Sequence, residues 1–287
     1  MCIDILDPQQ NETIFDPACG SGGFLVAAMD HVFNSIRTER DDENEILENQ
    51  KDYGSHNVFG IDYDRTIAKV AKAYMLIWGD GRANIAVADS LNETNWSDET
   101  AAKFSIGRGN TRRLRQFDII ATNPPFAGDI SADDTLSRYT LAFKEQNGKR
   151  KRVNKLARDK MFIERCLTFL KPGGRLAIVV PRGTLKNYTD ERVRRFILQR
   201  AEVVGAVSLS GLMFKPFTNT KTCVLFLKKR VAEIQDVTKI SRKSPMVFGV
   251  STSPGKDRAG NLIKDAKGKI LSDLPQIAKF FSSNIHW

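Results

Sequence analysis

The segment from Thr13 to Leu25 constrains the fold of this chain more than any other. It begins as a short β-prone run that ends at Asp16, and it continues through small residues to the glycines Gly20, Gly22 and Gly23. Apolar residues then recur at helical spacing, at Phe24, Leu25, Ala28, Val32 and Ile36. A strand, a glycine turn and a helix in this order are typical of nucleotide-binding α/β folds. In these folds the glycines let the backbone approach a ligand and let the first helix pack closely on the sheet.

The chemistry of this turn indicates which ligand it suits. It lacks the Gly-Lys-Ser/Thr ending of a phosphate loop, and its glycine spacing departs from the dinucleotide pattern G-x-G-x-x-G. Asp16 stands ahead of the glycines, where a carboxylate favours a cationic ligand over a pyrophosphate. S-adenosylmethionine carries a sulfonium and an amino group, so it is the ligand that we predict.

Strand and helix patterns alternate along the rest of the chain. We expect further strands at 57–61, 84–88, 117–122, 175–180, 203–209 and 221–228, and helices at 65–78, 159–170 and 189–200. The helix at 65–78 is predicted from the spacing of Ile67, Val70, Ala71, Tyr74 and Ile77. Alternation of this kind predicts an α/β fold with a doubly wound, mostly parallel sheet. Because the stretch between the last two strands lacks helical periodicity, it suits a hairpin, and the last strand should be antiparallel.

Four segments have a less regular pattern. The acidic stretch 39–48 reads as a surface loop or a polar helix extension, and 92–116 reads as a long connection. The loop from 127 to about 158 is too long for a passive connection, so we expect it to be functional. Residues 231–287 carry turn signals at Gly255, Gly260 and Gly268 and are predicted to form a small hairpin and a terminal helix.

The tetrapeptide Asn123-Pro124-Pro125-Phe126 closes the apolar run that begins at Phe117. An Asn side-chain oxygen and a backbone carbonyl can accept hydrogen bonds from both N–H groups of an exocyclic amine on a planar base. The prolines stiffen the loop, and the aromatic ring offers a stacking face. A rigid turn without chemistry is the alternative interpretation of Pro-Pro after a strand.

Positive charge is unevenly distributed. The net charge is +10, and the stretch from Lys144 to Lys160 holds eight Lys or Arg against Glu145 and Asp159, which makes +6. A solvated, mobile basic loop is one interpretation. Contact with nucleic acid phosphates is the other, because the stretch follows the Asn-Pro-Pro-Phe loop on the side where a substrate must lie.

Composition excludes several classes of protein. No apolar run approaches the roughly 20 residues of a membrane span, and the first residues lack a signal-peptide pattern. The cysteines, at 2, 19, 166 and 223, show neither metal spacing nor a disulfide framework, so a reducing cytoplasm is predicted. The histidines, at 31, 56 and 286, are scattered, so we predict no metal site.

These motifs together resemble the amino-methylating DNA methyltransferases. The longer match, from Asp16 to Phe24 with Asn123 to Phe126, resembles the modification subunit of type I restriction–modification systems. Phe59-Gly60-Ile61-Asp62 and Ala88-Asp89-Ser90-Leu91 follow in the family's order. The resemblance implies an S-adenosylmethionine-dependent, Rossmann-like catalytic domain over 1–230 and an extension over 231–287.

The same resemblance implies an activity and partners. The activity is methylation of adenine N6 in double-stranded DNA, with a separate specificity subunit and possibly a restriction subunit as partners. The family usually carries a helical domain before the glycine motif, whereas about twelve residues precede it here. We therefore expect the chain to lack that domain and to methylate negligibly by itself.

The resemblance also implies which residues hold the cofactor. Asp16 would face the methionine amino group, Asp62 the ribose hydroxyls, and Asp89 the adenine amino group. Alternatively, Asp16 forms a turn and Asp62 caps the helix that follows, while Ser90 or a capping role competes with the role of Asp89. Cys19 has no histidine nearby in the sequence, so packing is favoured over a nucleophile. The full predicted set is Asp16, Ala18, Gly20, Ser21, Gly22, Asp62, Asp89 and Asn123.

For methyl transfer, the predicted catalytic residues are Asn123, Pro124, Pro125 and Phe126. Asn123 and the Pro124 carbonyl would hold the amine, and Phe126 would stack on the flipped base. A second aromatic would close the sandwich, with Phe214 preferred over Phe217.

Two other functions fit the motifs less well. A methyltransferase acting on protein glutamine shares the amide chemistry but commonly presents Tyr at the position of Phe126. A noncatalytic DNA-binding or assembly subunit would keep the fold without the chemistry. A dehydrogenase is disfavoured by the glycine spacing.

Overall fold

A computed structural model describes residues 1–78, 84–107, 111–146, 148–240 and 245–287. Within these residues, eight strands form one sheet in the order β14-β12-β13-β11-β6-β1-β2-β3. Its strands are β1 (Ile14–Asp16), β2 (Val58–Asp62), β3 (Asn84–Val87), β6 (Phe117–Thr122), β11 (Leu170–Pro181), β12 (Ala201–Ser208), β13 (Thr222–Lys229) and β14 (Val247–Val250).

The predicted α/β fold is confirmed. Strands β1, β2, β3, β6 and β11 pair in parallel, and β13 runs antiparallel to both β11 and β12. The predicted antiparallel strand at 221–228 is therefore correct to within one residue. One strand of this eight-stranded sheet was not predicted, since β14 extends the sheet by pairing in parallel with β12.

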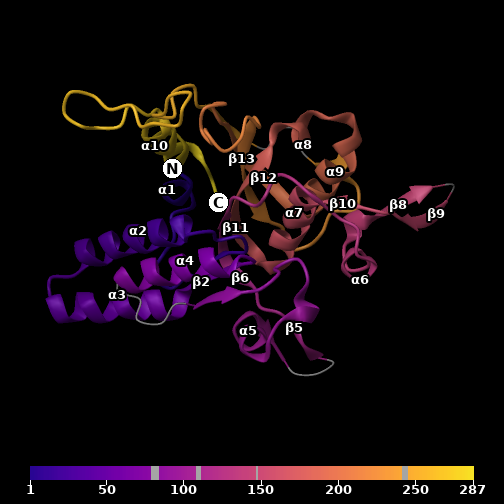
Figure 1. Cartoon of the computed structure of the whole chain (residues 1–287), viewed down its shortest axis with the longest axis horizontal. Helices are drawn as coiled ribbons and strands as arrows, with labels where there is room; N and C mark the ends of the chain where they lie inside the picture. The colour runs from indigo at the N-terminus through magenta and orange to yellow at the C-terminus, as the bar shows by residue number, and fades with distance from the viewer. Residues whose placement is uncertain (79–83, 108–110, 147, 241–244) are drawn as a thin grey trace.

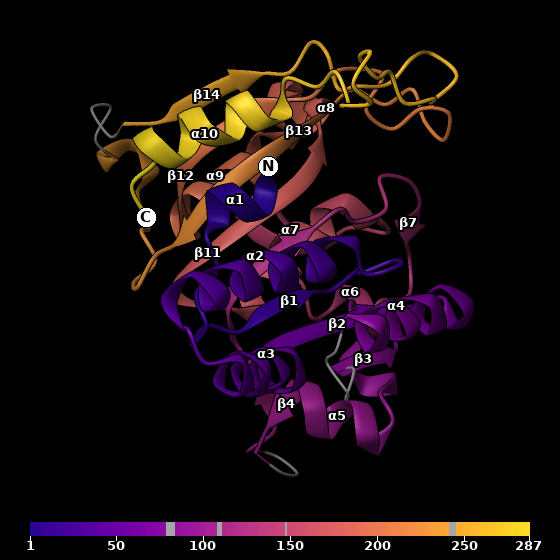
Figure 2. The same ribbon diagram turned by 90° about the vertical axis from the view of Figure 1, so that its left-hand side faces the viewer.

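Helices cover both faces of the sheet, as a doubly wound fold requires (Figure 1). One layer holds α1 (Cys2–Leu6), α2 (Gly23–Glu39), α3 (Glu43–Asn57), α4 (Arg65–Ile77) and α10 (Leu274–Asn284). The other holds α5 (Asp98–Phe104), α7 (Arg158–Phe169) and α9 (Glu191–Arg200), while α8 (Arg182–Lys186) follows β11. Figure 2 looks onto the first layer, with α1, α2, α3 and α10 in front of the strands.

Alternation along the strands builds the two cores. In β11, Leu176, Ile178 and Val180 belong to the core beneath α7 and α9, whereas Ala177 and Val179 belong to the core beneath α1 and α2. Successive strand residues point to opposite faces, and every one of these side chains is buried. A strand buried on both faces reads as the continuous apolar run seen in the sequence.

Two of the predicted connections are wrong in part. The acidic stretch 39–48 runs into a separate helix, α3, whose first turn is capped by the Asp42 side chain, which accepts from the backbone amides of Asn44 and Glu45. The stretch 92–116 contains α5 and a short pair of strands, β4 (Ser105–Ile106) and β5 (Arg113–Leu114). Residues 108–110 of that stretch lie outside the described residues.

The loop from 127 to 158 is built from short elements. β7 (Asp129–Ile130) pairs with β10 (Leu156–Ala157) at its base, followed by α6 (Asp133–Leu136). Beyond them, β8 (Phe143–Gln146) and β9 (Lys149–Arg152) form a hairpin, so the basic stretch there is strand rather than loop. Residue 147 lies outside the described part.

The segment 231–287 contains the predicted terminal helix as α10. Antiparallel bridges join Lys256 to Leu262 and Lys264 to Ile270, in keeping with the expected turns. The segment also contributes β14 to the main sheet, and Phe281 of α10 is buried in the core beneath α1 and α2. The boundary at residue 230 stays a prediction, and residues 241–244 are not described.

A membrane-crossing helix would need a long apolar run, and none of the helices in the described ranges has one.

Candidate functional site

The glycine turn joins β1 to α2 at the carboxyl edge of the sheet. The Cys19 amide donates to the Ile61 carbonyl (2.9 Å), and the Gly22 amide donates to the Cys19 carbonyl (2.8 Å). Gly20 and Gly22 have φ values of +54° and +86°, which favour glycine. A Cβ built on Gly22 would contact the Ala71 Cβ at 3.5 Å, so the turn also packs closely against α4.

Asp16 ends β1 and is almost fully buried, with 1% of its surface exposed. Its Oδ1 accepts from the Ala18 amide (3.0 Å) and from the Thr122 hydroxyl (2.7 Å). Its Oδ2 takes no hydrogen bond from any described residue. Burial raises the pKa of Asp16 to about 7, against the opposing effect of the two hydrogen bonds. A cation placed beside this carboxylate would favour its ionised form.

Asp62 ends β2 and supports the glycine turn directly. Its Oδ2 accepts from the Gly20 amide and its Oδ1 from the Asp64 amide, both at 2.8 Å. The N-cap of α4 is Asp64, whose side chain accepts from the amides of Thr66 and Ile67. The capping alternative for Asp62 is therefore wrong. Each carboxylate oxygen has further lone-pair capacity for a hydroxyl donor.

Asp89 follows β3 and lies next to Asp62 in the backbone network. The Ala88 amide donates to the Asp62 carbonyl (3.0 Å), and Asp89 Oδ1 accepts from the Leu91 amide (2.9 Å). Ser90, the competing residue, is buried and donates to the Pro17 carbonyl (2.7 Å). Asp89 is half-buried, so of these two side chains it is the accessible one.

A cavity of about 640 Å³ lies at the glycine turn, between α1 and α2. It brings together five of the predicted residues: Asp16, Ala18, Gly20, Ser21 and Asn123. The other predicted residues do not line it, although Asp62 is bonded to Gly20 at its edge; they are Gly22, Asp62, Asp89, Pro124, Pro125 and Phe126. The Asn123 Oδ1 is buried and has no hydrogen-bond partner among the residues that the structure describes. An unpaired buried acceptor costs free energy, so this atom is set up to receive a donor from a ligand.

The Asn-Pro-Pro-Phe loop gives Asn123 this position. Pro124 is buried and Pro125 exposed, and the Phe126 ring packs edge-on against Phe214, with the centroids 5.8 Å apart and the planes at 70°. Phe217 is 91% exposed. Of the two aromatics considered for the base sandwich, Phe214 is therefore the one beside Phe126.

The sequence did not indicate the far wall of the cavity. This wall comes from Met1–Asp4 in the N-terminal segment and from the face of α2 that carries Phe24, Ala27, His31 and Asn34. These α2 residues recur at helical spacing, which is the signal that could have identified them. His31 Nε2 lies 2.9 Å from Asp7 Oδ1, which ties α2 to the end of α1.

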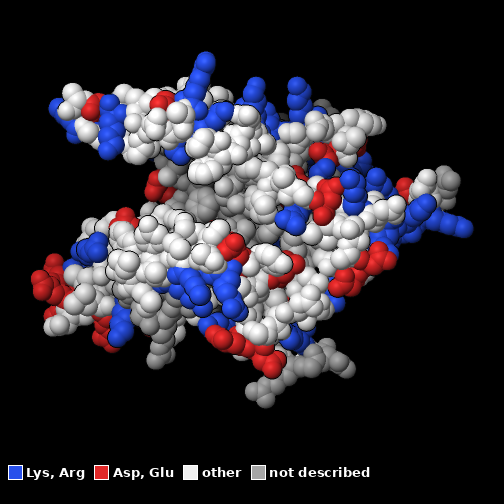
Figure 3. Space-filling model, in the orientation of Figure 1, with Lys and Arg blue, Asp and Glu red and all other residues white. Residues whose placement is uncertain are grey.

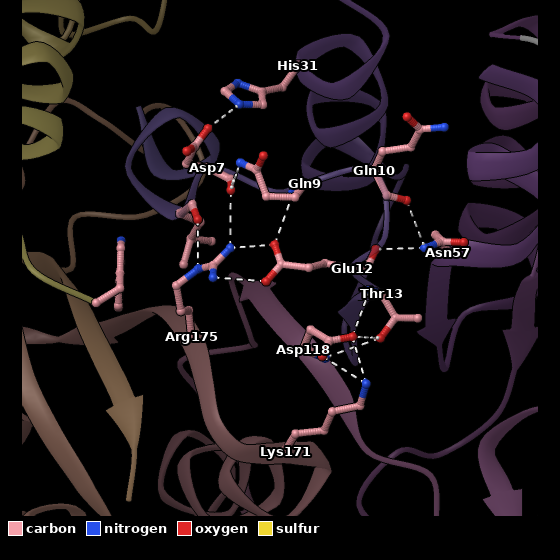
Figure 4. A network of polar contacts seen from close by, with 12 residues as sticks. Asp7, Gln9, Gln10, Glu12, Thr13, His31, Asn57, Asp118, Lys171 and Arg175 are labelled. Atoms are coloured by element: carbon pink, nitrogen blue, oxygen red, sulfur yellow. Dashed lines mark hydrogen bonds and ion pairs between the residues drawn. The ribbon is translucent and has the colours of Figure 1, made fainter. Parts of the chain in front are cut away.

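Arg175 of β11 holds the N-terminal segment in place (Figure 4). Its guanidinium donates to both Glu12 carboxylate oxygens (3.0 and 2.6 Å) and to the carbonyls of Leu6 and Asp7. From the other side, the Trp287 indole donates to the Ile5 carbonyl (3.0 Å). The cavity wall is thus fixed by residues remote in the sequence.

Cys19 is buried beside the turn, and burial, followed by the nearby Asp16 charge, raises the pKa of its thiol well above the usual range. A thiol that resists ionisation is a poor nucleophile, in agreement with the packing interpretation.

Comparisons with known proteins relate the chain to one family. The model of the N-6 DNA methylase family matches residues 1–257. The methylase subunit of the type I restriction enzyme EcoEI from Escherichia coli is 27% identical over 229 residues, which are 79% of this chain and 40% of that protein. The chain thus spans well under half the length of that relative.

Two solved structures share the fold. The type I restriction–modification system methyltransferase subunit from Streptococcus thermophilus superposes with a TM-score of 0.62 and 20% identity, over 99% of this chain and 51% of its own. A Listeria monocytogenes chain described as a class I S-adenosylmethionine-dependent methyltransferase gives a TM-score of 0.55 and 18% identity, over 98% and 68%.

Proposed function

Because the chain belongs to the N-6 DNA methylase family, we propose that it transfers a methyl group from S-adenosylmethionine to the exocyclic N6 of adenine in DNA. The observation that carries this proposal is the unpaired, buried Oδ1 of Asn123 on the cavity that Asp16 and the glycine turn also line. It supports the proposal because an acceptor for an amine then shares a cavity with a carboxylate suited to a cation.

The residues at the turn fit the cofactor. Asp16 is a buried residue whose Oδ2 takes no hydrogen bond from the residues that the structure describes, which suits the amino group or the sulfonium of S-adenosylmethionine. Gly20 and Ser21 line the same space without bulk, and Asp62 and Asp89 stand at successive strand ends, where ribose and adenine would be bound. When bound, the cofactor supplies a methyl group activated by a positively charged sulfur.

Asn123 and Pro124 would prepare the acceptor. The lone pair of an adenine amine conjugates into the ring, which makes the nitrogen a weak nucleophile. If the Asn123 Oδ1 and the Pro124 carbonyl accept hydrogen bonds from its two N–H groups, the nitrogen is drawn toward tetrahedral geometry and its lone pair is freed. Positioning then supplies most of the rate, and the product amine loses its extra proton to solvent. Phe126 would stack on the base, a contact worth roughly 1–3 kcal/mol in single-strand binders.

Phe214 adds a condition to base stacking. Because its ring is in edge contact with Phe126, a base can stack between the two only if Phe214 moves. Otherwise the base takes the free face of Phe126.

A finer proposal concerns partners. The similarity to type I methylase subunits supports a role as the modification subunit, with target choice supplied by a separate specificity subunit and with a restriction subunit as a further partner. Methyl transfer by the chain alone is then expected to be negligible.

The test is Asn123→Ala, assayed with tritiated S-adenosylmethionine and duplex DNA in the presence and absence of the specificity subunit. We expect the wild-type chain to label DNA only with that protein and the variant to lose labelling. Cofactor binding, followed by calorimetry, should be retained, because Asn123 is only one of several polar residues proposed to hold the cofactor. Labelling that persists in the variant would refute the assigned mechanism, and labelling of protein glutamine instead of DNA would refute the substrate.

A further inference from the structure

The hairpin of β8 and β9 projects from the body of the molecule (right-hand side of Figure 1). Its strands pair Phe143 with Arg152, Lys144 with Lys151, Glu145 with Arg150 and Gln146 with Lys149. The base is anchored: the Val153 amide donates to the Ala142 carbonyl (2.8 Å), and Arg192 of α9 donates to the Phe143 carbonyl. The projection is therefore a fixed element.

The two faces of this hairpin differ in charge balance. Because side chains alternate along a strand, Phe143, Glu145, Arg150 and Arg152 share one face. There the Arg150 guanidinium lies 4.1 Å from the centre of the Phe143 ring, and Arg152 pairs with Asp133 at 2.6 Å. The cations of this face are thus occupied by the protein itself.

The opposite face, which we term the lysine face, carries Lys144, Lys149, Lys151 and Gln146. All four side chains are exposed, and none of the three lysines forms an ion pair with a described residue. Lys144 stands directly across from Lys151, an arrangement of like charges that destabilises a strand pair. An anion bound between them would remove that repulsion.

A groove of about 560 Å³ extends the lysine face toward the body. Lys144 and Lys151 line it together with Lys155 and Lys160, which pair with Asp129 and Asp190 respectively. Figure 3 shows basic side chains gathered on this side of the molecule and continuing onto the projection. The shape and charge suit an extended polyanion better than a single small anion.

The hairpin is also tied to the candidate site. The segment that bears it begins at residue 127, directly after Phe126, and the Arg158 amide closes it on the Gly128 carbonyl (3.0 Å). A DNA duplex whose base enters the cavity must pass close to where this segment leaves the body. A duplex carries one charge for about every 1.7 Å of its axis, which a row of unpaired lysines would neutralise.

We propose that the lysine face binds the phosphate backbone of double-stranded DNA, outside the base-binding cavity and without reading the sequence. This inference rests on the proposed function, since it assigns that function's substrate to a second surface. The contact would set the position of the duplex, as phosphate contacts do, rather than select a base.

The experiment measures binding of a fluorescent duplex by anisotropy between 0.05 and 0.3 M salt. The test variant is Lys144→Gln/Lys149→Gln/Lys151→Gln. The matched control is Lys264→Gln/Lys267→Gln/Lys269→Gln, which removes the same charge from exposed lysines of the C-terminal segment, remote from the hairpin. The test variant should weaken binding roughly 10- to 100-fold at 0.1 M salt and reduce the slope of log K against log salt by about 2–3, with little effect from the control.

Three outcomes would overturn the proposal: equal losses in test and control variants, an unchanged slope in the test variant, or displacement of the duplex by polyglutamate of equal charge. Thermal unfolding of both variants checks that the fold is intact. If methyl transfer fails in the wild-type chain even with the specificity subunit, while the lysine-face difference in duplex binding persists, the proposed function falls and this inference stands. If methyl transfer succeeds and the lysine-face variant binds duplex DNA like the control, the proposed function stands and this inference falls.

Discussion

Asp16 shows how one buried carboxylate can lower the stability of the folded protein. Its carboxylate is buried against Thr122, and burial raises its pKa to about 7, compared with about 3.9 in an unfolded chain. Between these values the folded protein holds a proton that the unfolded chain has released. Asp16 therefore lowers the free energy of unfolding progressively as the pH rises from about 4 to about 7.

Replacing Asp16 with Asn should remove this effect. We expect the variant to exceed the wild type in free energy of unfolding by on the order of 2–4 kcal/mol at pH 8, and by little at pH 4. Urea denaturation at the two pH values measures the difference. Calorimetry should show that the more stable variant has lost S-adenosylmethionine binding. A variant equally destabilised at both pH values would show that charge burial is not the cause.

The placement of Asp16 and Asn123 on one cavity was within reach of the sequence. Both follow strands that were predicted correctly, and parallel strands bring their carboxyl ends to one edge. The position of Thr122 as a partner of Asp16 was not, because the register between β1 and β6 is a property of the assembled sheet. The roles of these residues in catalysis stay predictions until the variants are measured.

At the scale of elements, α4 shows where periodicity misleads. The helix was predicted at 65–78 and lies at Arg65–Ile77, yet the apolar spacing that predicted it belongs largely to the exposed face. Ile67, Val70, Tyr74 and Ile77 are 42%, 43%, 48% and 79% exposed. The buried face carries Ala68, Ala71 and Met75, and at Ala71 the glycine turn approaches α4 too closely for a larger side chain.

This difference between the two faces of α4 predicts that substitutions on them change the free energy of unfolding by unequal amounts. Ala71→Leu places three more carbons against Gly22 and should lower the free energy of unfolding by about 1–3 kcal/mol. Ile77→Ser, a loss of apolar surface on the open face, should change it by less than about 0.5 kcal/mol. Chemical denaturation of the two variants provides the comparison. A large loss for Ile77→Ser with none for Ala71→Leu would reverse the assignment of the faces.

Other elements were missed for identifiable reasons. The helix α3 has few buried residues, with Gln50, Tyr53 and Gly54 facing inward, so its apolar signal is weak. The start of α3 was indicated by Asp42 followed by Glu45, which is a capping pattern. This pattern is a stronger signal for a helix than the acidic composition is for a loop. Strand β14 is four residues long, and only Val247 among them is buried, which leaves little alternation to recognise.

For the whole molecule, the sequence predicted the doubly wound sheet but not how remote segments meet. Strand patterns indicate which residues are buried, whereas contacts between α1, β11 and α10 join segments with no shared periodicity. Arg175 is the central residue of these contacts, and its guanidinium also lies 6.0 Å from the centre of the Trp287 ring. Because α1 lines the cavity, these contacts connect the stability of the molecule to its capacity to bind.

Arg175→Lys should expose that connection. Lysine keeps the charge but cannot reproduce the fork that reaches Glu12 and two carbonyls, so we expect a loss of about 2–4 kcal/mol in the free energy of unfolding. Calorimetry should also show weaker S-adenosylmethionine binding. The matched control is Arg195→Lys, which affects an exposed pair with Glu191 and should cost less than about 0.5 kcal/mol. Equal effects from both substitutions would contradict the special position of Arg175.

The hydrogen bond from Trp287 to Ile5 spans 282 positions of sequence. Contacts that close such long loops carry a large entropic cost and form slowly, after the local elements are in place. We therefore expect the chamber beside the glycine turn to be completed late in folding, when the segments around Ile5 and Trp287 come together. By the same reasoning, we expect it to open before the sheet itself loosens.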